Sequence, residues 1–240
     1  MKRTKTKTKK AIWTKTQVFA RMRELGNPRN VAGMARFGVR VSPKNAFGLS
    51  APDMKKLARE IGENHPLALA LWRTGNHDAR HIAHMIADPR KFTEAQAERW
   101  ARDFNSWDIV DGTCFYLLIN TPYAWKKARE WPQREAEFIR RAGFTMMACL
   151  AVHDKQAADA EFLRLLPIIE RYSDDDRNFV RKAVNWALRQ IGKRNLALNR
   201  AAIACAERVR ARDTRAARWI AADALRELKS PAVQRRLRTN

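Results

Sequence analysis

EFIRRAGFTMMACLA at residues 137–151 and NFVRKAVNWALRQIG at residues 178–192 share one pattern. Each has a phenylalanine, two basic residues and an alanine ahead of apolar residues at helical spacing. Fainter copies are HDARHIAHMIA at 77–87 and DTRAARWIAADALREL at 213–228. Phe138 precedes Phe179 by 41 positions, and Trp186 precedes Trp219 by 33. Such spacings are typical of stacked helical-pair repeats, and HEAT-like repeats match best.

The remaining sequence also predicts helices. Ala and Leu are abundant, and only nine Gly and nine Pro occur in 240 residues. Helix start signals recur at Ser50, at Thr93 with Gln96 three positions on, and at Ser106. We therefore predict an all-α chain, with a basic flexible tail over residues 1–11 and one HEAT-like solenoid domain over residues 12–240.

The charge distribution favours a polyanionic partner. The net charge is +23, and the middle of the chain, residues 46–176, is close to neutral. Residues 1–45 contain 13 Lys or Arg and one acid, and residues 177–240 contain 17 and four. In residues 177–240 the charges alternate with apolar residues at helical spacing, which a solvated tail does not require. If the second helix of each pair lines the inner surface, these residues predict a concave basic groove that binds nucleic acid.

Several classes of protein receive no support. No apolar run is long enough to span a membrane, and no apolar signal-peptide core follows the basic start, so the default compartment is the cytoplasm. Cys114, Cys149 and Cys205 are scattered, which predicts buried thiols rather than disulfides. The glycine-rich phosphate-binding motifs and the serine-hydrolase motif are missing.

Two polar clusters have ordinary structural interpretations. His77, His81 and His84 share one helix stripe, but there is no H-E-x-x-H motif and no cysteine ligand nearby. We therefore interpret them as packing or phosphate-contact residues rather than a metal site. The SDDD stretch at 173–176 is interpreted as a cap of the following helix rather than a cation site.

SWDIVDGTC, from Ser106 to Cys114, contains the candidate chemistry. If Ser106 caps the helix, Trp107 and Asp111 lie four positions apart on one face. Asp108 is assigned to the helix N-terminus, but Asp111 lies too deep in the helix to be a cap. It is either part of a hydrogen-bonded core pair or a carboxylate in a cleft with an aromatic wall.

SWDIVD (106–111), FIRRAGF (138–144) and FVRKAVNWALRQIGKRN (179–195) together resemble the AlkD-type DNA alkylation repair family, and NAFGLSAPDMKKLAREIG (45–62) resembles its early helices. These are HEAT-like DNA glycosylases that remove N3- and N7-alkylated purines from duplex DNA. The resemblance runs in order from about residue 30 to residue 230, and residues 1–10 lie outside it. It implies that the chain is a monomeric glycosylase without a metal or organic cofactor.

The resemblance also implies site residues. Trp107, Asp111 and Trp186 correspond to the family's catalytic cleft, and Arg141 corresponds to its DNA-contacting arginine, with Arg140 as a one-residue alternative. Basic residues around Trp186 are further candidates for DNA contact, namely Lys182, Arg189 and Lys193. Trp186 is thus expected to face DNA, the alternative being a core position.

Two other classes of function stay open. A HEAT-like protein that binds DNA structures without catalysis would keep the basic groove but would need neither Asp111 nor the two tryptophans. A scaffold for acidic proteins would have no use for a tryptophan–aspartate face.

If the chain is a DNA-repair enzyme, we expect it to act in the cytoplasm, associated with the nucleoid.

Overall fold

The computed structural model describes residues 13–239, and within this range every regular element is a helix. The all-α prediction is therefore confirmed for the described residues. Their contacts divide them into two compact units, residues 13–91 and residues 92–239, which are described separately below. The single solenoid domain over 12–240 stays a prediction, and the tail over 1–11 lies outside the described residues.

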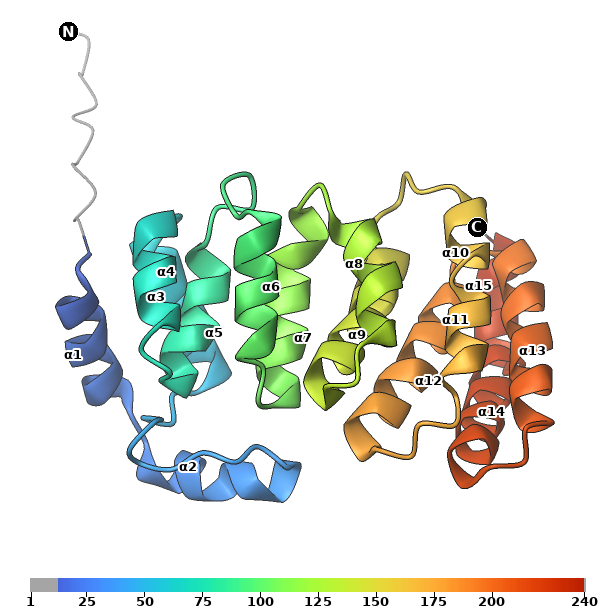
Figure 1. Cartoon of the computed structure of the whole chain (residues 1–240), viewed down its shortest axis with the longest axis horizontal. Helices are drawn as coiled ribbons and strands as arrows, with labels where there is room; N and C mark the ends of the chain where they lie inside the picture. The colour runs from blue at the N-terminus through green and yellow to red at the C-terminus, as the bar shows by residue number, and fades with distance from the viewer. Residues whose placement is uncertain (1–12, 240) are drawn as a thin grey trace, which may run out of the picture. The chain divides into compact units, whose positions relative to one another are not determined.

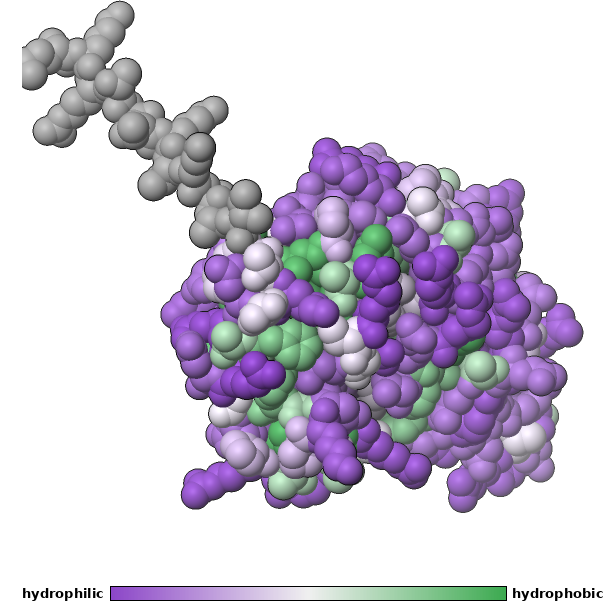
Figure 2. All heavy atoms as spheres, turned by 60° about the vertical axis from the view of Figure 1, so that its left-hand side comes forward, coloured by the Kyte–Doolittle hydropathy of each residue, from purple (hydrophilic) through white to green (hydrophobic). Residues whose placement is uncertain are grey.

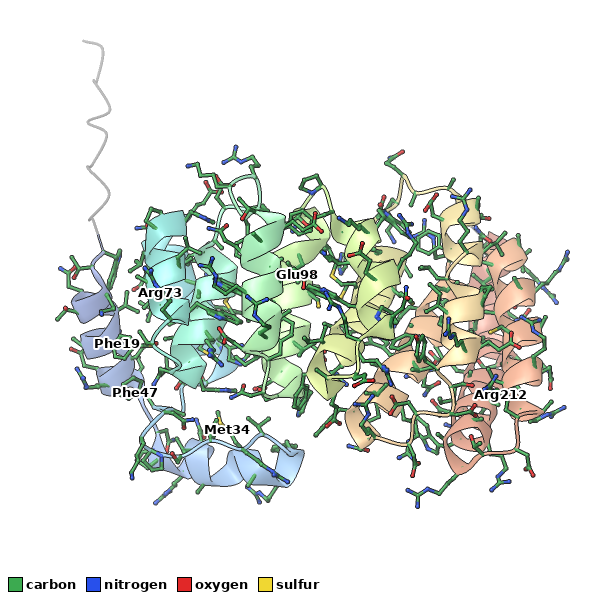
Figure 3. All side chains as sticks on the ribbon, in the orientation of Figure 1. Phe19, Met34, Phe47, Arg73, Glu98 and Arg212 are labelled. Atoms are coloured by element: carbon green, nitrogen blue, oxygen red, sulfur yellow. The ribbon has the colours of Figure 1, made fainter. Side chains whose placement is uncertain are left out.

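The first unit, residues 13–91, places α2 crosswise to its other helices (Figure 1). Phe19 and Phe47 meet edge to face, with ring centroids 5.8 Å apart (Figure 3). The Asp78 carboxylate accepts hydrogen bonds from the backbone N–H groups of Phe47, Gly48 and Leu49, and so fixes the loop before α3. Its elements are α1 (Lys15–Leu25), α2 (Pro28–Met34), η1 (Ala35–Phe37), α3 (Ala51–Ile61), α4 (His65–Trp72) and α5 (His77–Ile86).

The three histidines of α5 lie along one stripe, as the sequence predicts. The rings of His77 and His81 lie 4.9 Å apart between centroids, and those of His81 and His84 lie 5.2 Å apart, both edge to face. All three side chains are buried, so ring packing is part of what this stripe contributes.

The second unit, residues 92–239, contains the stretches that define the repeat. α8 packs on α9, α11 on α12, and α13 on α14, while α7, α9, α12 and α14 form one row in which each helix packs on the next (Figure 1). Its elements are α6 (Glu94–Arg102), α7 (Trp107–Tyr116), η2 (Leu118–Asn120), α8 (Ala124–Glu130), η3 (Trp131–Gln133), α9 (Glu137–His153), α10 (Asp159–Leu163), α11 (Leu166–Arg171), α12 (Asn178–Gly192), α13 (Leu196–Arg210), α14 (Arg215–Leu228) and α15 (Pro231–Thr239).

Helix α9 is the most deeply buried member of this row. Every residue from 141 to 151 is buried. Gly143 faces η3, where a Cβ atom would collide with the ring of Pro132, so only glycine allows the two elements to approach this closely. A helix so enclosed holds its polar side chains, Arg141 and Thr145, in fixed positions.

The contacts between stacked helices recur at a separation of 38 residues. Arg208 of α13 binds Glu170 of α11, with 2.8 Å between Nε and the carboxylate oxygen. The guanidinium of Arg181 on α12 lies 4.8 Å from the ring centroid of Trp219 on α14. The sequence offsets of 41 and 33 therefore lie on either side of the 38-residue structural repeat. Trp219 lies opposite Arg181 and is not in a position equivalent to Trp186. Further pairs at this separation are Arg212 with Asp174, Asn185 with Asp223, and Arg189 with Glu227 (Figure 3 labels Arg212).

The helix start signals at Ser50 and at Thr93 with Gln96 are confirmed by side-chain caps, while Ser106 occupies the N-cap of α7 without a side-chain cap hydrogen bond. The Ser50 hydroxyl accepts from the N–H of Asp53, and Thr93 and Gln96 form a reciprocal capping box. The capping role predicted for residues 173–176 is wrong, because α12 has Arg177 at its N-cap and no side-chain cap hydrogen bond. The three aspartates bind arginines instead: Asp174 binds Arg212, Asp175 binds Arg140 and Arg177, and Asp176 binds Arg215.

The three cysteines are buried, and the face of the molecule in Figure 2 is mainly polar. Cys114, Cys149 and Cys205 are buried free thiols, as predicted. The face shown in Figure 2 is mainly hydrophilic, with smaller hydrophobic areas between the polar side chains. None of the helices in residues 13–239 combines the length and the hydrophobicity of a transmembrane segment.

Candidate functional site

The predicted site residues lie on three successive helices of the row, α7, α9 and α12, except Lys193, which directly follows α12. Helix α7 begins at Trp107 after the N-cap Ser106. The Asp108 carboxylate accepts from the Ser106 hydroxyl at 2.6 Å and from its neighbour's N–H, that of Ile109, at 2.9 Å. Asp108 therefore serves the start of the helix, as predicted, whereas Asp111 lies one turn further along.

The Asp111 carboxylate is held by three donor atoms from α9. Arg141 binds it with two parallel hydrogen bonds, 3.0 Å from Nε to Oδ1 and 2.7 Å from Nη2 to Oδ2. The Thr145 hydroxyl donates to Oδ1 at 3.1 Å. The Asp111 side chain is nevertheless 23% exposed, while that of Arg141 is 7% exposed. The carboxylate is thus fixed in direction, and part of the Asp111 side chain remains exposed.

Arg141 also joins α9 to α12. Its Nη1 donates to the backbone carbonyl of Phe179, in the first turn of α12, at 2.7 Å. All three nitrogens of the guanidinium therefore have protein partners. The structure places Arg141 behind the carboxylate as its support, and contact between Arg141 and DNA stays a prediction.

Burial and pairing act on Asp111 in opposite directions. Burial raises the pKa of its carboxyl above the ordinary value, because the charged form loses hydration. The Arg141 guanidinium and the Thr145 hydroxyl oppose this rise by stabilising the carboxylate. Two other carboxylates of the second unit have lowered pKa values, although burial raises both: Asp175, which binds Arg177 and Arg140, and Glu227, which binds Lys193 and Arg189.

The two tryptophans are partly exposed. Trp107 lies one turn before Asp111 on α7, and Trp186 lies in the middle of α12 between the buried residues Asn185 and Ala187. Since Trp186 is half-buried, the choice between a core residue and a DNA-facing residue is not decided by its exposure, and its contact with DNA stays a prediction.

The other predicted DNA-binding residues divide into paired and unpaired side chains. Arg140 donates to the Pro132 carbonyl and to Asp175, and Lys193 binds Glu227 at 2.7 Å. Arg189 binds the same glutamate. Lys182 is exposed, and the structure records no side-chain partner for it among residues 13–239. Within residues 92–239, no three His, Cys, Asp or Glu side chains gather closely enough to hold a metal ion.

Sequence reasoning did not identify Thr145 as part of this site. Thr145 is fully buried, and its hydroxyl reaches Asp111 across the α7–α9 contact. It lies four positions after Arg141 and therefore on the same helix face. That spacing was the available signal, but only the packing of α9 against α7 shows which carboxylate this face meets.

Thr145→Val is expected to raise the pKa of the Asp111 carboxyl further. The substitution keeps the side-chain shape and removes a donor that lowers the pKa of Asp111. The lost hydrogen bond also costs about 1 kcal/mol of unfolding free energy. Thr113→Val is the matched control, because the buried Thr113 hydroxyl donates to the Ile109 carbonyl and not to Asp111. NMR titration of the Asp111 carboxyl carbon in both variants checks this, and equal pKa values in the two variants contradict it.

Comparison with known proteins gives a family match and a match to a solved structure. The family model described as DNA alkylation repair enzyme matches residues 18–228. A solved structure described as "a new family of proteins related to the HEAT-like repeat DNA glycosylases with affinity for branched DNA structures" has a TM-score of 0.71 and 23% sequence identity, over 80% of this chain and 82% of that one. At this identity the structural match shows the HEAT-like fold. No curated protein matches the chain.

Proposed function

Since this chain belongs to the DNA alkylation repair enzyme family, we propose that it is a DNA glycosylase that hydrolyses the N-glycosidic bond of N3- and N7-alkylated purines in duplex DNA. In this proposal it acts as a monomer, without a metal or organic cofactor. The observation that carries the proposal is the Asp111 carboxylate, which three hydrogen bonds orient and which is still partly exposed.

The proposed reaction uses the negative charge of this carboxylate. An alkylated purine already carries positive charge, so it leaves as a neutral base once the bond from C1′ to nitrogen breaks. The departing base leaves cationic character on the deoxyribose, as in other glycosidic cleavages. A fixed carboxylate stabilises that cation and orients the water that attacks C1′, and a proton of this water passes to solvent.

The flanking residues supply positioning. Trp107 and Trp186 present aromatic faces that favour cationic sugar and base character. Arg141 and Thr145 hold the carboxylate, so that little reorganisation is needed when charge develops. Lys182, which is exposed on α12, is proposed to bind a backbone phosphate.

The direct test is release of methylated purines from duplex DNA by the wild-type protein.

Trp186→Ala is expected to reduce excision by about tenfold, on the scale of one lost cation–π contact. The protein should lose less stability than on truncation of a fully buried tryptophan, because the Trp186 side chain is half-buried. Base release is measured by chromatography, and unfolding by circular dichroism. The control is Trp219→Ala, because Trp219 on α14 is also partly exposed, at 38%. Equal losses in the two variants contradict the role of Trp186.

A second candidate is binding of DNA structures without catalysis. The specific observation in its favour is that Arg141 already neutralises Asp111 with a bidentate pair, which lowers the net charge that the site offers to a cation. The similar solved structure is described as having affinity for branched DNA structures. This candidate predicts no base release by the wild-type protein, together with tighter binding to branched DNA than to a linear duplex of the same length.

A further inference from the structure

A cavity of about 430 Å³ lies where the C-terminal ends of α9 and α12 meet α15. It belongs entirely to the second unit. No acidic residue lines it, and its polar lining is cationic or neutral. The lining residues are Ala151, Val152, Lys155, Gln190, Lys193, Arg194, Asn195 and Arg236.

The four cations of this cavity have few carboxylate partners. Lys193 binds Glu227, and this is the one ion pair that the structure records for these four side chains among residues 13–239. Arg194 donates to the backbone carbonyls of Ala151 and Ala157 and has a buried Nε without a hydrogen-bond partner. Like charges gathered in a partly enclosed space raise the local positive potential, and a bound anion would lower it.

Helix capping explains part of this cluster. The Ala151 carbonyl bound by Arg194 lies in the last turn of α9, and Arg236 donates through one nitrogen, Nη2, to the carbonyl of Lys193 at the end of α12. Cations at helix C-termini are favourable in their own right. Lys155 has no such role, because the structure records no partner for its Nζ and its side chain is exposed. Capping therefore leaves Lys155 and the unused donors of Arg236 unexplained.

We propose that this cavity binds a phosphodiester group of a DNA strand, with Lys155 and Arg236 as the side chains that contact its oxygens. Several positively charged hydrogen-bond donors around a small space suit a tetrahedral phosphate, because its oxygens accept hydrogen bonds from several directions. The assignment to DNA rests on the proposed function, but it requires only binding, not base excision. Neither Lys155 nor Arg236 is among the residues that the sequence analysis predicts for DNA contact.

The test compares two double variants of equal charge. Lys155→Gln/Arg236→Gln removes both proposed contacts, while Arg200→Gln/Arg235→Gln removes two exposed positive charges that do not line the cavity, one of them on the same helix as Arg236. Affinity for an undamaged fluorescent duplex is measured from about 50 to 200 mM salt. The cavity variant is expected to bind at least about tenfold more weakly, and the slope of log affinity against log salt should fall by about 0.9, the value for one lost phosphate contact.

The control variant should retain the wild-type slope to within about half a contact. Equal slopes and affinities in the two double variants would overturn the proposal. Calorimetric titration with inorganic phosphate distinguishes a free phosphate ion from a DNA phosphodiester as the bound anion. Phosphate binding that depends on Lys155 and Arg236, together with unchanged duplex affinity, would also overturn it, since the cavity would then take a free anion. Loss of duplex affinity in the cavity variant supports the proposal even if the wild-type protein releases no methylated base, so the two proposals fail independently.

Discussion

Asp111→Asn is expected to lower the rate of base excision by about 10²-fold or more, which is the scale of losing one preorganised electrostatic group. The asparagine fills the same space and can still accept a hydrogen bond from Arg141, but it carries no negative charge to stabilise a cationic sugar. Binding to undamaged duplex should stay near the wild-type value, because the carboxylate contributes nothing to phosphate contacts. Single-turnover release of methylated purine gives the rate, and fluorescence anisotropy gives the affinity.

Asp108→Asn is the matched control for this experiment. It removes the same charge three positions earlier, where the carboxylate binds Ser106 and the start of α7. It should cost at most about 1 kcal/mol of stability and leave excision almost unchanged. If Asp111→Asn excises methylated bases at the wild-type rate, the catalytic assignment is wrong.

Arg141→Gln is expected to produce the largest loss of stability, about 3 kcal/mol of unfolding free energy. The substitution leaves the Asp111 carboxylate in a mostly buried position without its cation, and it removes the hydrogen bond to the Phe179 carbonyl that ties α9 to α12. Losing the guanidinium also raises the pKa of Asp111 further, since Arg141 opposes that rise in the wild type. Excision at neutral pH should therefore fall more than the loss of folded protein accounts for. Chemical denaturation and excision per folded molecule measure the two effects.

Arg140→Gln separates the structural effect from the effect on the site. Arg140 has a comparable set of partners, Asp175 and the Pro132 carbonyl, but it does not touch Asp111. The Arg140→Gln variant should lose stability, and its excision per folded molecule should fall less than that of Arg141→Gln. The double variant Arg141→Gln/Asp111→Asn should be more stable than the sum of its single losses predicts, because no unpaired charge is left. Strict additivity would argue against a coupled pair.

The sequence by itself determined the features that depend on residues within one or two helical turns. The hydroxyl of Ser50 and the box of Thr93 with Gln96 start their helices through contacts three positions along the chain. Trp107 and Asp111 share a face because they are four positions apart. The assignment of Asp108 to a helix end is confirmed for the same reason. The all-α class follows from many such local preferences acting together.

Only the tertiary structure decided what each helix face meets. Asp111 and Arg141 are 30 positions apart, and their pairing depends on α9 packing against α7. The aspartates at 174–176 are local cap candidates, but the carboxylates of Asp174 and Asp176 bind arginines 38 and 39 positions further along the chain. The cationic cavity draws its lining from α9, α12 and α15 and from the chain beyond the first two. Net charge is a sum over the sequence, whereas pairing and desolvation depend on distances of a few ångströms, which only the stacking of the helices determines.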